Sequence, residues 1–251
     1  MSFKKFLVVF LVLATLVMGC STVYAANLKA VGASNLVDPW SSDDNITGET
    51  VPTEQQYIAY KASLSAYDLQ NIVAKEELAS KYANKIGTKS GTKISIPGTF
   101  TMYQQETDTY CIPATIKSIL MYINGSSPSQ STIAGTTGTD PTKIAGYLNA
   151  RQNTCYYVYR AKNDLTQNGM CSYLYTTIAS TKVPASMGIS GTTTSNWYYV
   201  TNGHSLVVNA IYDDYSYIQF GDPLGDRVAG CPYYYLKSSS LCYSVCTRIV
   251  W

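Results

Sequence analysis

Four residues have the side chains and local settings needed for nucleophilic chemistry at a carbonyl carbon. Cys111 stands where the polar stretch 104–110 meets an apolar run of helical spacing. Backbone N–H groups and the positive end of a helix would stabilise a thiolate at that position. Gln105 lies six residues earlier, where its amide N–H can point at the same reacting carbonyl as an oxyanion donor.

An imidazole and a carboxylate follow later in the chain. His204 is the only histidine, so any imidazole chemistry must use it. It stands after Gly203 at the start of an apolar, β-branched run, and Asp222 closes the next strand-like run. Adjacent antiparallel strands would bring the two side chains together. The carboxylate would then accept an imidazole N–H and fix its tautomer while His204 acts as the base for Cys111.

The elements that must position these residues predict an α+β fold. Helical spacing indicates one or two amphipathic helices over 54–85, and further helices over 112–124, 141–150 and 172–180. Strand patterns cover 155–160, 183–189, 204–212 and 217–221. Helices that come early and antiparallel strands that come late are typical of an α+β domain.

The N-terminal residues predict export. Lys4 and Lys5 precede a short apolar run, and Val23-Tyr24-Ala25 is typical of a cleavage site, so residues 1–25 are interpreted as a signal peptide. Val17-Met18-Gly19-Cys20 is an alternative lipoprotein site, with a lipid anchor on Cys20. The apolar run is too short for a stable membrane span. The protein is therefore expected to be secreted or on the surface of a bacterial cell.

Three regions are expected: the signal peptide 1–25, a leader and helical region 26–94, and a globular domain 95–251. Residues 26–52 are rich in Ser, Asp and Asn, which indicates a loop or flexible leader. The helical part can act as a pro-segment that covers the cleft of the domain, or as an ordinary N-terminal cap.

Composition excludes several classes of partner. Charged residues make up 14% of the chain, and after the two lysines of residues 1–25 the basic and acidic residues are equal in number. Nucleic-acid binding is not expected, because there is no basic block. The sequence contains no Gly-rich phosphate loop and no His-Glu-x-x-His pattern, so neither a cofactor nor a metal is predicted.

The cysteines suggest disulfides. Six remain after Cys20, an even number that allows three bridges in an exported protein. A buried structural thiol or half of a disulfide is therefore the other interpretation of Cys111. If Cys111 is a free nucleophile, at least one further thiol has no disulfide partner.

The order of these motifs resembles the papain-like cysteine peptidases, and most closely the C39-like peptidase domain of secreted bacterial proteins. The resemblance covers about residues 98–225. It rests on Gln105, Tyr110-Cys111-Ile112-Pro113-Ala114, Gly203-His204 and Asp222-Pro223, with Gln130-Ser131-Thr132-Ile133-Ala134 between the helices. Ile112 replaces the usual Gly of the family.

The resemblance implies a papain-like fold and hydrolysis of a peptide or protein substrate by Cys111, His204 and Asp222, with Gln105 as oxyanion donor. Two alternatives remain open at this level. One is a non-catalytic cell-surface binding module on a peptidase-like fold, which a disulfide at Cys111 would favour. The other is a thiol acyltransferase or transpeptidase that uses the same residues.

Overall fold

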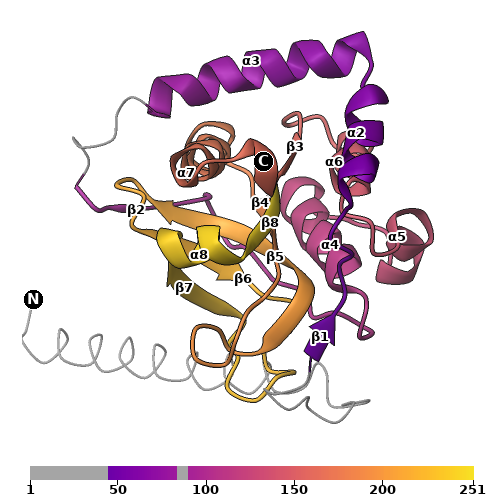
Figure 1. The fold of residues 1–251 in the computed structure, drawn as a ribbon, viewed down its shortest axis with the longest axis vertical. Helices are drawn as coiled ribbons and strands as arrows, with labels where there is room; N and C mark the ends of the chain where they lie inside the picture. The colour runs from indigo at the N-terminus through magenta and orange to yellow at the C-terminus, as the bar shows by residue number, and fades with distance from the viewer. Residues whose placement is uncertain (1–44, 84–89) are drawn as a thin grey trace, which may run out of the picture. The chain divides into compact units, whose positions relative to one another are not determined.

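Strand β5 (Val200–Tyr212) is the centre of the sheet, because four other strands pair with parts of it. The computed structural model describes residues 45–83 and 90–251, so the predicted signal peptide and the Cys20 anchor lie outside the described residues. Figure 1 shows the sheet between two groups of helices. The antiparallel path runs β3-β8-β4-β5-β6-β7, formed by β3 (Tyr159–Ala161), β8 (Cys246–Val250), β4 (Ala185–Ile189), β6 (Tyr217–Gly221) and β7 (Tyr234–Ser238).

Two short strands extend the pairing of β5 at its ends. Strand β2 (Lys93–Ser95) pairs antiparallel with Ala210–Tyr212 near the end of β5. Strand β1 (Asn45–Thr47) pairs parallel with the start of β5, where Ile46 lies opposite Thr201. The first residues of β5 therefore have a partner from the N-terminal segment as well as from the domain.

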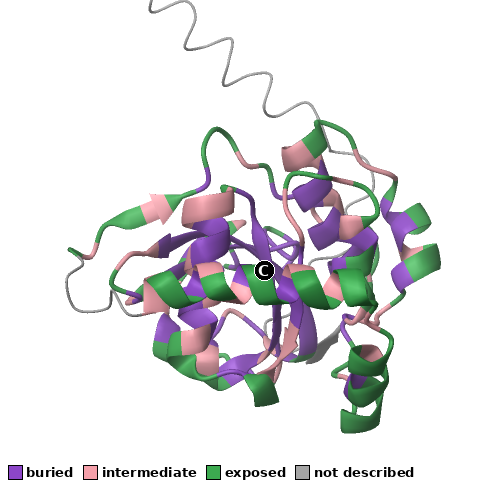
Figure 2. Ribbon diagram, turned by 90° about the horizontal axis from the view of Figure 1, so that it is seen from above, coloured by how far each residue is buried: buried purple, intermediate pink, exposed green. Residues whose placement is uncertain are grey.

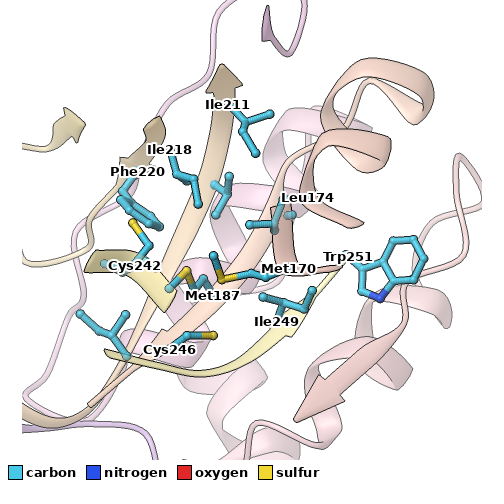
Figure 3. Packing of buried hydrophobic residues seen from close by; sticks show 14 of the residues in the cluster. Met170, Leu174, Met187, Ile211, Ile218, Phe220, Cys242, Cys246, Ile249 and Trp251 are labelled. Carbon is cyan, nitrogen blue, oxygen red and sulfur yellow. The ribbon is translucent and has the colours of Figure 1, made fainter. Parts of the chain in front are cut away.

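Alternation along β5 produces two hydrophobic cores. Leu206 and Val208 point to one face of the sheet and Val207 to the other, as the two-residue repeat of a strand requires. The first face packs against α7 (Gln167–Thr176) and α8 (Ser239–Val245), and Figure 3 shows Met170 and Leu174 of α7 against the strand residues. The second face packs against α4 (Cys111–Asn124) and α6 (Lys143–Asn149).

The remaining helices follow local sequence rules. Thr53 and Gln56 form a reciprocal capping box that begins α2 (Glu54–Ala62). Ser129 accepts a hydrogen bond from Thr132 N at the start of α5 (Gln130–Thr137). Helix α7 continues into a π-helical turn (Thr177–Thr181), and a 3₁₀ turn (Lys162–Asp164) follows β3.

Helix α3 (Ala66–Ala83) lies over α7 and is attached by polar contacts. The Lys75 ammonium donates to Tyr156 O at 2.9 Å, and the Ser172 hydroxyl donates to Ala79 O at 2.9 Å. Only Ile72, Lys75 and Ala79 of this helix are buried, and Figure 2 shows the exposed outer face.

The α+β prediction is confirmed, with differences in detail. The stretch 54–85, predicted to contain one or two helices, contains two, whereas the helix expected at 172–180 begins five residues earlier because Thr166 caps it. The strand expected at 155–160 covers only 159–161. The C-terminal β7, α8 and β8 were not predicted, because their Tyr- and Cys-rich sequence has no clear period. Within 45–83 and 90–251, no helix has both the length and the apolar composition needed to cross a membrane.

Two further expectations are wrong. A loop or flexible leader is predicted for residues 26–52. In the structure, residues 45–47 form β1, and the two residues that follow it, Gly48 and Glu49, are buried. Backbone hydrogen bonds hold this stretch, and side-chain patterns cannot reveal them. The expected disulfides are also absent, because all six cysteines of the described residues are free.

Candidate active site

Cys111 is the first residue of α4 and has no exposed surface. Helix α4 forms because its apolar residues recur on one side, and Gly125 ends it with a positive φ of 70°. The residue before Cys111, Tyr110, makes no side-chain capping hydrogen bond. Pro113 has no N–H, and Ala114 N donates to Tyr110 O at 2.9 Å, so the N–H groups of Cys111 and Ile112 are those that no turn of the helix can bond and that a negatively charged oxygen beside the thiol could use.

His204 and Asp222 form a fully buried pair. His204 Nε2 lies 3.0 Å from Asp222 Oδ1, and neither side chain is exposed. The pair forms because β5 and β6 are antiparallel neighbours, with Val207 opposite Gly221. Asp222 follows β6 directly, so the hairpin brings it back to the start of β5.

The pair changes the titration of both groups. Burial by itself lowers the pKa of His204, but the Asp222 carboxylate and the neighbouring Cys111 side chain outweigh burial and raise it to about 10. Burial raises the pKa of Asp222, but the imidazole and the hydroxyls of Tyr199 and Tyr235 outweigh it and lower the pKa below the ordinary value. The charged forms, imidazolium and carboxylate, therefore stabilise each other.

The Asp222 carboxylate is held by several donors besides the imidazole. The hydroxyls of Tyr199 and Tyr235 each donate to Oδ2 at 2.6 Å, and Leu224 N donates to Oδ1 at 2.8 Å. Burial and the nearby carboxylate raise the pKa of both phenols well above the ordinary value, which keeps them neutral donors. The sequence does not indicate this role, because tyrosines in strand-like runs usually belong to the core.

Cys111 is the third residue of this group. The thiol is near enough to raise the pKa of His204. In the part of the chain that the structure describes, His204 Nδ1 is nevertheless buried without a hydrogen-bond partner of ordinary geometry. Since Nε2 faces Asp222, Nδ1 is the ring nitrogen that remains for an interaction with the thiol. The structure brings Cys111, His204 and Asp222 together, and Cys111 is free, not bridged as the binding-module alternative would favour.

Gln105 is buried below the loop that leads to Cys111. Its Nε2 donates to Thr107 O at 2.9 Å and to Asp108 O at 3.1 Å, which uses both amide hydrogens, while its Oε1 is buried without a partner among the described residues. Arg227 donates to Gln105 O at 3.1 Å and to Asp108 Oδ1 at 2.6 Å. Gln105 therefore supports the loop in this state and does not point a free N–H at the thiol.

Neither a metal-binding cluster nor a large pocket is found at these residues in the part of the chain that the structure describes. Across 45–83 and 90–251, no three His, Cys, Asp or Glu side chains are arranged to hold a metal ion. A pocket of about 550 Å³ lies between α2 and α6, and its lining includes none of the four predicted site residues.

Comparisons with known proteins give little beyond this geometry. No family model matches the sequence, and no curated protein is similar to it. Among solved structures, xylellain, a cysteine protease from Xylella fastidiosa, is similar over 68% of this chain and 87% of its own chain, with 12% sequence identity and a TM-score of 0.44. A likeness this distant does not carry a function, so the assignment depends on the arrangement of Cys111, His204 and Asp222.

Proposed function

We propose that the protein is a cysteine peptidase of the papain-like type, exported by a bacterium and similar to the C39-like peptidases. One observation carries the proposal: a buried imidazole is hydrogen-bonded to a carboxylate and interacts with a free thiol at the start of a helix. Nucleophile, base and orienting group in this order are the arrangement that acyl transfer through a thiol needs.

In the proposed reaction, one proton is shared between the Cys111 sulfur and His204 Nδ1, and it lies on the imidazolium when the sulfur bonds to the carbonyl carbon of a peptide. The tetrahedral intermediate collapses when the C–N bond breaks, and His204 returns the proton to the leaving amine. Water then attacks the thioester, again losing a proton to His204, which releases the acid and restores the thiol. Asp222 keeps Nε2 protonated and the ring oriented.

Oxyanion stabilisation is assigned first to the backbone N–H of Cys111. Gln105 contributes an amide hydrogen only if it releases Thr107 O or Asp108 O when substrate binds. Replacing Gln105 by Glu removes the donor at nearly constant size, and kcat should fall by about 10²–10³-fold if the side chain acts in this way. An unchanged kcat would restrict Gln105 to supporting the loop.

The main test compares two thiol variants. Cys111→Ala should abolish hydrolysis of a casein-derived peptide mixture, measured by the new amino groups released, because the nucleophile is lost. Cys155→Ala is the matched control, since Cys155 is a free, partly exposed thiol in a loop before β3. Equal hydrolysis by Cys111→Ala and the unmodified protein would end the proposal.

Export is part of the proposal and depends on the sequence of residues 1–25. N-terminal sequencing of the protein recovered from the producing cells should begin at Ala26. A lipid-modified Cys20 as the first residue would instead support the anchored form, and an N-terminus at Met1 would contradict both.

A further inference from the structure

The chain covers its own candidate nucleophile. Gly48 lies directly on Cys111: a Cβ atom built on Gly48 would be 2.7 Å from Cys111 Sγ. Residue 48 must therefore be glycine, because the Cβ atom of any other residue would collide with the sulfur of Cys111. The complete burial of Cys111 and His204 agrees with a cleft that is filled.

Backbone hydrogen bonds fix this segment as they would fix a bound peptide. Gly48 N and Glu49 N both donate to Gly203 O, at 2.8 and 3.0 Å, and Thr50 N donates to Thr139 O at 2.9 Å. Gly203 lacks a side chain where the Glu49 carbonyl oxygen approaches it. These contacts use no side chain of the segment, so a different peptide could make them in the same way.

One side chain of the segment, Glu49, enters a specific pocket. Arg248 Nε donates to Glu49 Oε1 at 3.1 Å, and Arg248 Nη2 donates to Glu49 Oε2 at 2.5 Å, which is a two-point contact between guanidinium and carboxylate. The side chains of Arg248 and Glu49 are 0% and 1% exposed.

The pocket belongs to the domain and not to the segment. The hydroxyls of Ser186 and Ser205 accept from Arg248 Nη1 and Nη2 at 2.6 and 2.7 Å, which orients the guanidinium. Gly188 provides the space, because a Cβ atom there would overlap Glu49 Oε1. Strands β4, β5 and β8 thus form a site in which the positive charge of Arg248 is oriented to bind a carboxylate.

We propose that Arg248 determines the specificity of this site: it binds an acidic side chain of the substrate, in the residue directly after the one that lies on Cys111, where Glu49 of the chain is bound here. The inference deepens the proposed peptidase function and rests on it. Ser186 and Ser205 hold the guanidinium in the position for a two-point contact with a carboxylate, so Arg248 favours an anionic occupant once the segment leaves. A substrate must first displace residues 48–50, which makes the segment a competitive occupant of the cleft.

The first measurement is the rate at which iodoacetamide alkylates Cys111, followed by peptide mapping. Glu49→Gln weakens the two-point contact, and alkylation should become at least about 10-fold faster because breaking a buried ion pair is strongly unfavourable for the covered state. Glu54→Gln is the control, since Glu54 is an exposed carboxylate of α2 in the same region, and its rate should match the unmodified protein. Equal rates in all three proteins would overturn the inference.

The second measurement tests the acidic preference without requiring turnover. Two peptides, acetyl-Asn-Ile-Thr-Gly-Glu-Thr-amide and its Gln analogue, are used to protect Cys111 of the Glu49→Gln protein from alkylation. The acidic peptide should give half protection at a concentration at least about 10-fold lower, since only it offers a carboxylate to Arg248. Equal protection by the two peptides would overturn the proposal for Arg248.

A variant of the pocket separates recognition from general peptide binding. Adding Gly188→Ala to Glu49→Gln fills the carboxylate position, and the difference between the two peptides should disappear. A preference that persists would place recognition elsewhere and contradict the assignment. If the acidic peptide protects selectively but no peptide is cleaved, the recognition site stands and the peptidase function fails, so the two conclusions are tested separately.

Discussion

Two acid–base pairs are fully buried among residues 45–83 and 90–251, and they differ in how the chain assembles them. His204 and Asp222 are 18 residues apart and are joined by one hairpin of the sheet. Glu49 and Arg248 are 199 residues apart, and Glu49 lies on a segment that backbone hydrogen bonds hold in the cleft. The first pair is therefore a permanent part of the domain, whereas the second exists only while residues 45–50 stay in place. The two pairs are equally buried. They differ because both members of the first are held by neighbouring strands of the sheet, whereas one member of the second belongs to a segment held by backbone hydrogen bonds.

The largest effect on stability is expected from Arg248→Met. It should lower the free energy of unfolding by about 2–4 kcal/mol, because the hydroxyls of Ser186 and Ser205 cannot leave the interior and lose their buried donor, while the Glu49 carboxylate loses its anchor and can leave with the segment. Urea unfolding at pH 7, followed by circular dichroism, measures the change.

Glu49→Gln is the matched comparison for that variant, and it should cost clearly less. The segment can leave, and water then reaches Arg248, so the unpaired charge is not trapped. Equal costs for the two variants would contradict the view that this pair depends on a removable segment.

The His204–Asp222 pair predicts a dependence of stability on pH. The pKa of His204 is raised from 6.5 to about 10, so protonation stabilises the folded state. That contribution is complete below pH 6.5 and is lost as the pH rises through about 10. Nuclear magnetic resonance can follow the single imidazole directly, and in Asp222→Asn its pKa should fall well below that of the unmodified protein.

Unfolding measurements need the same variant as a reference. Burial lowers the pKa of Lys75 to about 8, which changes stability in the opposite direction over part of the same range. The difference between the unmodified protein and Asp222→Asn, measured from pH 6 to pH 10, removes this contribution. If the difference stayed constant with pH, the pair would not be ionised in the folded protein.

A smaller effect is expected from Tyr199→Phe. The variant removes one of the two phenol donors to Asp222 Oδ2, but Tyr235 still donates at 2.6 Å. Because the carboxylate keeps a partner on that oxygen, the loss of stability should be about 1–2 kcal/mol. Tyr199→Phe/Tyr235→Phe should cost more than the sum of the single variants, and strict additivity would show that the two hydroxyls do not support the same oxygen.

Much of the fold and the core of the candidate site follow from local patterns. Strand β6 has the predicted bounds, and β5 extends the predicted strand by four residues toward its start. The proximity of His204 and Asp222 follows from those two strands and the short turn between them. Cys111 at the start of α4 follows from the apolar spacing of that helix and the Gly125 stop.

The remaining features depend on contacts that no local pattern encodes. Arg248 lies in a C-terminal strand that the sequence does not predict, and Glu49 lies in the predicted leader. Nothing in the residues around either one indicates that the two side chains form an ion pair. Gly48 is recognisable only by what lies beside it, which is the sulfur of Cys111. Counting six cysteines gives an even number but no distances, and the thiols are free.

The smallest effect is expected at an exposed pair that serves as the reference for both buried ones. Lys143 and Asp140 approach to 3.9 Å, with side chains 53% and 40% exposed, so water screens their attraction. Lys143 is also the first residue of α6, where a positive charge opposes the helix dipole, and alanine favours the helix. Lys143→Ala should therefore change the free energy of unfolding by less than about 0.5 kcal/mol in either direction. A cost close to that of Arg248→Met would mean that burial is not what gives the ion pairs of this protein their importance.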